Sequence, residues 1–311
     1  MDNNVVKTLN LHRHFGKKEA LAGLSINIDR HSITGLIGRN GSGKTTLLKI
    51  IAGRLDKTSG RVEVFGGQPM DNLPVLSRLV YTYHNMGYDT GYEFGNFSSI
   101  SLKTILFAYN TMFPNFDPGF ASKLMKYFDL NGKMKYKSLS QGMASIFNFL
   151  CALACRAELT MFDEPVLGMD VTVRKAAYEI LLRDFAQHPR TFIVSSHLLS
   201  EIEGVLSDIL LIEQGKAVLH SPIDNVRQSA YRIDGAHGAV QGFVTGRNAI
   251  AHSKNELSSF AVIYEPHTES TVIAAKAQGL TVSTVRAEDL CVYLTSQNKK
   301  EELECLWQKA N

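Results

Sequence analysis

The segment from Gly38 to Thr45, with the pattern Gly-x-x-x-x-Gly-Lys-Thr, constrains the fold of this chain more than any other feature. The apolar run Ile33–Ile37 precedes it and the apolar residues 47–52 follow it, so the order is strand, glycine-rich loop and helix. A loop in this context turns its backbone N–H groups inward, and the helix start adds partial positive charge. The sequence therefore predicts a phosphate-binding loop rather than a glycine turn that binds nothing.

The residue types within the loop indicate separate tasks. Lys44 is expected to reach the β- and γ-phosphates, and the Thr45 hydroxyl is expected to coordinate Mg²⁺. The residues expected to contact the nucleotide are Gly38, Arg39, Asn40, Gly41, Ser42, Gly43, Lys44, Thr45 and Thr46.

Two adjacent carboxylates follow the apolar run Leu159–Phe162. In an open parallel sheet, ligands bind beyond the carboxyl ends of the strands, so Asp163 and Glu164 should lie at the same edge as the phosphate loop. Asp163 suits Mg²⁺, held through water, and Glu164 suits the activation of an attacking water. The alternative is an acidic helix start that only favours the helix dipole.

His197 follows a second apolar run, residues 191–196, and should reach the same edge of the sheet. We expect it to sense the γ-phosphate. The alternative is a structural histidine with satisfied hydrogen bonds.

Composition narrows the class of protein. The chain has 311 residues, 44% of them hydrophobic, which is enough for one large domain or two ordinary ones. Lys and Arg number 33 against 30 for Asp and Glu, so the net charge of +3 does not predict a nucleic-acid-binding surface. The four cysteines lack metal-ligand spacing and the first residues lack a secretory pattern, which indicates a reduced, cytoplasmic protein. The most apolar stretch, Ile146–Cys155, is too short to span a membrane and is typical of a buried helix.

Pattern changes along the chain predict two domains. Residues 1–223 alternate strand and helix patterns and include a helical region at about 98–157, broken by prolines and a glycine. Residues 224–311 carry weaker strand and helix patterns, which predict a small α+β accessory domain.

Leu139-Ser140-Gln141-Gly142-Met143 lies ahead of the acidic pair and begins a predicted helix. Ser140 can cap this helix while its hydroxyl and the Gly142 N–H face an anion, although a plain helix cap is the alternative. Together with the phosphate loop, the carboxylates and the histidine, this segment resembles the signature sequence of the ATP-binding-cassette (ABC) ATPases, the nucleotide-binding subunits of ABC transporters. The likeness covers about residues 3–222.

The resemblance implies an α/β fold with a phosphate-loop NTPase (ABC ATPase) sheet core, an antiparallel β subdomain and a helical subdomain, to which the small C-terminal α+β domain is added. It implies ATP and Mg²⁺ as cofactors. It also implies that two chains meet head to tail, so that Ser140, Gln141 and Gly142 of one contact the nucleotide of the other. Asp170 matches a position that contacts across this dimer. Phe15 matches the aromatic residue that stacks on adenine, with a plain core phenylalanine as the alternative.

Three positions depart from the family pattern. His84 follows the strand Leu79–Tyr83 where the family commonly has glutamine, and it or Asn85 is expected to approach Mg²⁺ or water. Met143 replaces a glutamine, and the pair 166–167 replaces a more polar one, but neither change removes a catalytic group. The expected metal-site residues are Thr45, Asp163 and His84.

The resemblance implies the ATP-binding and ATP-hydrolysing subunit of an ABC transporter, with Glu164, His197 and Lys44 as catalytic residues. The expected partners are a separate membrane permease, in an exporter, and either an identical chain or another ABC ATPase. No nucleic acid is expected, and the chain should lie at the inner face of the cell membrane. Residues 74–97 carry irregularly spaced aromatic side chains that suit docking of the permease, with ordinary domain packing as the alternative.

Two other classes of protein also contain a phosphate loop. A soluble ABC ATPase that acts on nucleic acid or ribosomes is the alternative function, but one cassette without heptads or a basic tract speaks against it. A small-metabolite kinase is disfavoured by the Ser140-Gln141-Gly142 segment.

Overall fold

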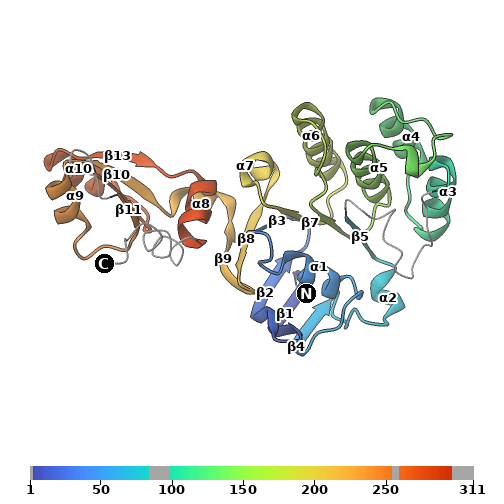
Figure 1. Cartoon of the computed structure of the whole chain (residues 1–311), viewed down its shortest axis with the longest axis horizontal. Helices are drawn as coiled ribbons and strands as arrows, with labels where there is room; N and C mark the ends of the chain where they lie inside the picture. Colours follow the sequence, from blue (N-terminus) through green and yellow to red (C-terminus); the bar gives the residue numbers. More distant parts are fainter. Residues whose placement is uncertain (1–2, 84–98, 254–258, 296–311) are drawn as a thin grey trace, which may run out of the picture. The chain divides into compact units, whose positions relative to one another are not determined.

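The computed structural model describes residues 3–83, 99–253 and 259–295. The chain folds as two compact units, Met1–Ala217 and Val218–Asn311 (Figure 1). Each unit has its own core of buried apolar side chains. The domain boundary expected from the sequence, at residue 223, lies six residues after the end of the first unit (223 − 217) and stays a prediction.

The first unit is built on a six-stranded sheet with the strand order β5-β6-β7-β3-β8-β9, whose last strand continues past Ala217 into the residues of the second unit. Its strands are β3 (Ile33–Ile37), β5 (Leu79–Tyr83), β6 (Leu159–Asp163), β7 (Thr191–Ser196), β8 (Asp208–Glu213) and β9 (Lys216–Pro222). The five strands β5, β6, β7, β3 and β8 run parallel. Every residue of β3, β6 and β7 is buried, as expected for continuous apolar runs in a parallel sheet covered on both faces. The carboxyl ends of these strands therefore meet at one edge.

A second, antiparallel sheet in this unit has the order β2-β1-β4. It consists of β1 (Asn4–Phe15), β2 (Lys18–Asp29) and β4 (Ser59–Val64), and β1 and β2 form a long hairpin that ends at the pair Phe15 and Lys18. Helix α1 (Lys44–Ile51) contributes Leu47 and Leu48 to the core that both sheets share. The start of α1 is thus fixed by packing on two sides.

Helices make up much of the remainder of the first unit. They are α2 (Leu73–Leu76), α3 (Leu102–Met112), α4 (Pro118–Tyr127), α5 (Gln141–Ala154), α6 (Val171–Gln187) and α7 (Leu199–Ile202). Of these, α3, α4 and α5 pack together as the helical region, drawn in green (Figure 1). Asp117 begins α4 by accepting a hydrogen bond from the Phe120 N–H at 2.8 Å, with Pro118 in the first turn.

Helix α5 is the buried helix predicted from the apolar stretch near residue 150. Residues 144–154 are all buried, and the polar Asn148 among them donates to the Tyr136 hydroxyl at 2.9 Å. Burial raises the pKa of the Cys151 and Cys155 thiols well above the ordinary value. Both cysteines therefore behave as small apolar side chains, as expected.

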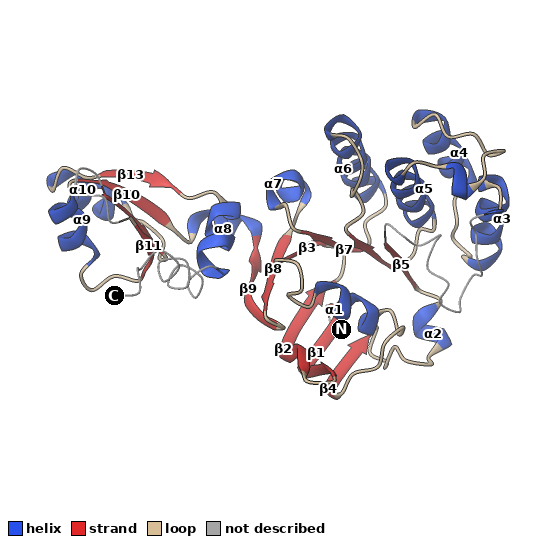
Figure 2. Cartoon of the chain, viewed as in Figure 1, coloured by secondary structure: helices blue, strands red, loops and turns tan. Residues whose placement is uncertain are grey.

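The second unit is an α+β structure, with helices and strands in one unit (Figure 2). Its sheet is antiparallel and has the strand order β11-β12-β10-β13. Its elements are α8 (Ile223–Gln228), β10 (Tyr231–Gly235), α9 (His237–Val244), β11 (Ala249–His252), β12 (Ser259–Ile263), α10 (Glu269–Ala277) and β13 (Thr281–Thr284), followed by a helix over residues 287–295. Tyr231, Phe243 and Ile263 lie in its core. The α/β class with a C-terminal α+β unit is thus confirmed.

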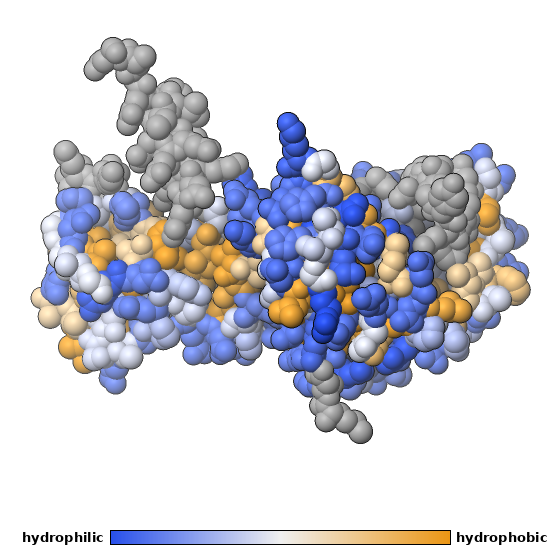
Figure 3. All heavy atoms as spheres, turned by 90° about the horizontal axis from the view of Figure 1, so that it is seen from below, coloured by the Kyte–Doolittle hydropathy of each residue, from blue (hydrophilic) through white to orange (hydrophobic). Residues whose placement is uncertain are grey.

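Hydrophilic residues predominate on the face shown in Figure 3, with smaller hydrophobic patches among them. Two of the most exposed apolar side chains, Leu73 (75%) and Phe107 (70%), belong to α2 and α3. Within the described ranges, no helix combines the length and the apolar composition needed to cross a bilayer.

Candidate functional site

The loop that is predicted to bind phosphate connects β3 to α1. Gly43 is the residue before α1 and has φ 112°, and a Cβ atom there would lie 2.6 Å from the Ala20 carbonyl oxygen, so only glycine fits. No side chain caps the start of α1, which leaves its first N–H groups available to an anion. The loop is therefore built as the sequence predicted.

Lys44 lies at the centre of this loop and is 6% exposed. Its Nζ donates to the carbonyl oxygens of Gly38 at 2.6 Å and Arg39 at 3.2 Å. Burial lowers the pKa of the Lys44 ammonium, while the negative charges of Glu164, Asp163 and Glu213 act in the opposite direction. Among the described residues, this buried ammonium donates its hydrogen bonds to carbonyl oxygens, and it is suited to a phosphate because the anion would offset its desolvation.

A cavity of about 490 Å³ joins the loop to the acidic pair. Its lining consists of Phe15, Lys18, Ala20, Asn40, Gly41, Ser42, Gly43, Lys44, Thr45, Thr46, Asp163 and Glu164. The buried Ser42 hydroxyl has no hydrogen-bond partner among the described residues. The cavity therefore offers the groups that a nucleotide with Mg²⁺ requires. These are the unpaired Ser42 hydroxyl, the buried Lys44 ammonium, the Thr45 hydroxyl and the Asp163 carboxylate.

Phe15 lies at the mouth of this cavity rather than in the core. Its side chain is 47% exposed, which excludes the alternative of a plain core phenylalanine. The Arg13 guanidinium lies 4.6 Å from the centre of the ring. With a cation near the ring and much of the side chain exposed, Phe15 is placed where an adenine could stack.

Asp163 ends β6 and is 5% exposed. Its Oδ1 accepts a hydrogen bond from the Ser195 hydroxyl at 2.6 Å, and its Oδ2 accepts one from the Tyr81 hydroxyl at 3.2 Å. Burial, followed by the charge of Asp163, raises the pKa of Tyr81 far above its ordinary value, so Tyr81 stays a donor. Two neighbouring strands thus orient this carboxylate.

Glu164 has a left-handed backbone with φ 51°, an uncommon conformation for a residue with a side chain. Its N–H donates to the Ser195 hydroxyl at 2.9 Å, which helps to hold this conformation. Its Oε2 lies 2.9 Å from Nδ1 of His197, and the side chains of Glu164 and His197 are 21% and 43% exposed. The predicted meeting of loop, carboxylates and histidine at one edge is present in the structure.

The signature segment is not among the residues that line this cavity. Ser140 begins α5 by accepting a hydrogen bond from the Met143 N–H at 3.2 Å, and Ser140 and Gln141 are exposed. Asp170 caps α6 in the same way, through the Val173 N–H at 2.9 Å, and is exposed too. The structure therefore presents these residues on the surface and not at the phosphate loop of the same chain.

Gly142 has a structural reason of its own to be glycine. A Cβ atom at this position would lie 2.5 Å from the Gly168 carbonyl oxygen. The turn at 166–169 therefore packs directly on the first turn of α5, and Ser145 donates to the Leu167 carbonyl oxygen at 2.8 Å across the same contact.

Sequence reasoning missed Ser195, Tyr81 and Glu213 as site residues. Ser195 pairs with Asp163 across β6 and β7. A polar residue near the end of an apolar strand is the sequence feature that could have indicated Ser195 as a site residue. Glu213 ends β8, and its Oε2 is buried without a hydrogen-bond partner in the part of the chain that is described. His84, the expected metal-site residue, lies outside the described residues.

Comparison with known proteins agrees with this architecture. The family model described as "ABC transporter" matches residues 21–167. The chain is 25% identical over 230 residues to the ABC transporter ATP-binding protein YtrB of Bacillus subtilis (74% of this chain, 76% of that protein). It is 25% identical to the bacitracin transport ATP-binding protein BcrA of Bacillus licheniformis (72% of each chain).

A solved dimeric ATP-binding cassette, described as a post-hydrolysis state bound to ADP and phosphate, has the same fold. It superposes with a TM-score of 0.58 at 19% identity, over 70% of this chain and 98% of that one. The matches cover the unit that contains the phosphate loop, the acidic pair and the signature segment. The chain therefore contains an ABC transporter domain at residues 21–167, is similar to the ATP-binding subunits of these transporters, and is an ABC ATPase.

Proposed function

We propose that this chain binds Mg-ATP at the 38–46 loop, hydrolyses it with Glu164, and thereby drives a separate membrane permease through ATP-dependent head-to-tail dimerisation. One observation carries the proposal: Lys44, Asp163 and Glu164 line a single cavity. Phosphoryl transfer to water needs a positive group for phosphate, a carboxylate for a metal ion and a base for the attacking water. Lys44, the buried Asp163 and the more accessible Glu164 can supply these groups in that order.

The proposed roles follow from the contacts of each residue. Lys44 and the N–H groups at the start of α1 bind the β- and γ-phosphates. Thr45 and Asp163 hold Mg²⁺, which when bound would neutralise charge on the phosphate oxygens. Glu164 accepts a proton from the attacking water, and His197 orients Glu164 through the 2.9 Å contact and faces the γ-phosphate.

A single chain lacks the second half of each proposed site. We infer that Ser140, Gln141 and Gly142 bind the γ-phosphate on the partner chain, and that Asp170 contacts the partner. The exposure of Ser140, Gln141 and Asp170 supports this role, as does the absence of all four residues from the cavity of their own chain. The partner is an identical chain or another ABC ATPase.

The permease is the proposed membrane partner, and export is the proposed direction. Leu73 on α2 and Phe107 on α3 are exposed apolar side chains of the kind found in protein interfaces. Most of the segment 74–97, which is predicted to dock the permease, lies outside the described residues, from residue 84 onward. The bacitracin relative supports an antibiotic-like substrate, whereas another relative is named for zinc uptake. Transport into inverted membrane vesicles would support export, and transport out of them would contradict it.

The decisive experiment is the Glu164→Gln variant. Glutamine keeps the size and hydrogen bonding of the side chain but is not a base, so hydrolysis should fall by about 10²- to 10⁴-fold while ATP still binds. The variant should then accumulate as an ATP-dependent dimer, detected by light scattering. If Glu164→Gln stays monomeric at saturating Mg-ATP, with the natural partner subunit present, head-to-tail dimerisation is wrong.

A matched pair of second changes tests the signature surface. Gly142 is unsuitable because any side chain there would collide with Gly168. Ser140→Asp keeps the helix cap, since Asp and Asn cap as well as Ser, but it adds a negative charge against the γ-phosphate. Added to Glu164→Gln, Ser140→Asp should dissolve the dimer and leave ATP bound, whereas Ser140→Asn should keep the dimer.

A further inference from the structure

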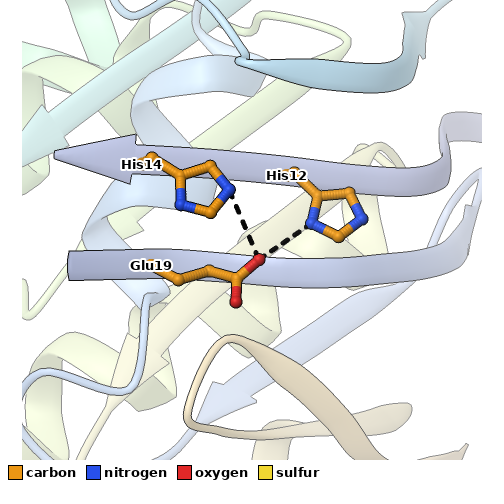
Figure 4. Close-up of side chains that lie close together, drawn as sticks. All are labelled: His12, His14 and Glu19. Carbon is orange, nitrogen blue, oxygen red and sulfur yellow. Dashed lines mark hydrogen bonds and ion pairs between the residues drawn. The ribbon is translucent and has the colours of Figure 1, made fainter. Parts of the chain in front are cut away.

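Three metal-ligating side chains meet on the β1–β2 hairpin, outside the nucleotide cavity (Figure 4). His12 and His14 are alternate residues of β1 and lie on the same face, with their rings stacked at 6.3 Å and 5° from parallel. Glu19 lies opposite His14 on β2. Its Oε1 is 2.9 Å from Nδ1 of His12 and 3.5 Å from Nε2 of His14. Two strands thus direct two nitrogens and one oxygen at a common point.

Both ring nitrogens of His12 have polar neighbours. Nε2 lies 3.2 Å from Oδ1 of Asn10, and Nδ1 lies 2.9 Å from Oε1 of Glu19. A tautomer with its proton on Nε2 donates to Asn10 and leaves the Nδ1 lone pair facing the point that His12 shares with Glu19, where a metal ion can accept it.

We propose that His12, His14 and Glu19 bind a divalent transition-metal ion of the zinc class, with solvent in the fourth position. Two donors about 2.1 Å from Zn²⁺ at a tetrahedral angle lie about 3.4 Å apart. The 2.9 Å and 3.5 Å separations lie on either side of this value, so small side-chain rotations complete the site. Two imidazoles and a carboxylate select zinc, copper or nickel over magnesium and calcium, which prefer oxygen ligands.

Asn10 supports the metal site from the side remote from the ion. Metal-binding histidines normally donate their other ring N–H to an oxygen, which fixes the tautomer, and the bond from His12 to Asn10 has this form. Lys216 is a neighbouring cation whose charge also acts on Glu19 and therefore opposes metal binding. The side chains of His12, His14 and Glu19 are 27%, 42% and 40% exposed, so an ion can enter from solvent.

The test measures Zn²⁺ binding by isothermal titration calorimetry, with the full chain, no polyhistidine tag and no nucleotide. Wild-type protein should bind one Zn²⁺ saturably, and His12→Ala and Glu19→Gln should each weaken binding by about 10-fold or more. Mg²⁺ should not bind here at matched concentration. The control is His188→Ala, which removes an exposed histidine at the end of α6 and should leave the affinity unchanged.

Several outcomes would overturn the site. Absence of saturable Zn²⁺ binding would mean that a proton alone joins His12 to Glu19. Zn²⁺ binding that survives both His12→Ala and Glu19→Gln would place the ion elsewhere, for instance at Glu164 and His197. Equal losses in His188→Ala would indicate only nonspecific binding by surface histidines.

The site also predicts a link to the nucleotide, and this link rests on the proposed function of Phe15. An ion that joins β1 to β2 at His14 restrains the hairpin tip that carries the next residue, Phe15. Saturating Zn²⁺ should therefore change the affinity for a fluorescent ATP analogue in wild type but not in Glu19→Gln. An unchanged affinity despite Zn²⁺ binding would contradict the link, whereas loss of ATP binding altogether would contradict the proposed function.

Discussion

Replacing Ser195 by alanine removes one oxygen atom that two groups of the site share. The hydroxyl donates to Asp163 at 2.6 Å and accepts from the Glu164 N–H at 2.9 Å, and Ser195 itself is fully buried. A hydrogen bond to a charged group contributes about 1.5–3 kcal/mol and a neutral one about 1 kcal/mol. Because water cannot replace either bond in so buried a place, the free energy of unfolding should fall by about 2–4 kcal/mol.

The same change should also slow hydrolysis, since the bond to Ser195 holds the left-handed backbone of Glu164. A small displacement of the catalytic carboxylate should lower kcat by about 10- to 100-fold while ATP affinity changes little. Hydrogen exchange of the β6 and β7 amides measures the stability of this unit alone, and a phosphate-release assay measures kcat.

Ser32→Ala is the matched control for Ser195→Ala. Ser32 is also a buried serine of the six-stranded sheet region, but its hydroxyl donates only to the Asp29 carbonyl oxygen at 2.9 Å. Ser32→Ala should therefore lower the free energy of unfolding by about 1 kcal/mol and leave kcat unchanged. If Ser195→Ala loses no more stability than Ser32→Ala and keeps its kcat, the assigned positioning of the two carboxylates is refuted.

Three further predictions concern the loop, the effect of acid and the second unit. Lys44→Ala should weaken ATP binding by about 10- to 100-fold, whereas Lys49→Ala at the other end of α1 should not, as measured by calorimetry; equal affinities would contradict the role of Lys44. Hydrogen bonds to Arg78 lower the pKa of Glu158, and the Phe120 N–H lowers the pKa of Asp117. Both carboxylates therefore stabilise the fold above their unfolded pKa of about 4, and this stabilisation is lost as pH falls through their lower folded pKa values. Thermal unfolding between pH 6 and 3 should therefore show a steeper loss of stability in wild type than in Glu158→Gln, and parallel curves would argue against it. A chain that ends at residue 223 should keep ATP binding, because residues 224–311 contain their own core; failure of both parts to fold separately would contradict this boundary.

The sequence predicts best those features that depend on local pattern. Strands β6 and β7 match the expected apolar runs to within one residue, because a strand buried on both faces needs apolar side chains throughout. Glycine spacing likewise located the phosphate loop, where Gly43 must adopt a positive φ.

Other features depend on which distant residues become neighbours. Ser195 and Tyr81 reach Asp163 across separations of 32 and 82 residues, and no local period reports such a pairing. The local sequence does not indicate helix α9 for another reason: Gly238 and Gly242 both lie in its eight residues, and glycine disfavours helices. Its helical form depends on burying Val240 and Phe243 in the core of the second unit.

The close packing of Gly142 on Gly168 has a consequence for cooperativity. With the Ser145 bond to Leu167, it joins the first turn of α5 to the segment that directly follows Glu164, so the two should shift together. In a head-to-tail pair, the first turn of α5 would touch one ATP while Glu164 of the same chain touches the other. A displacement caused by hydrolysis at one nucleotide would then reach the other nucleotide through the backbone atoms of the Gly142–Gly168 contact. The two ATP molecules would be hydrolysed as a coupled pair rather than independently.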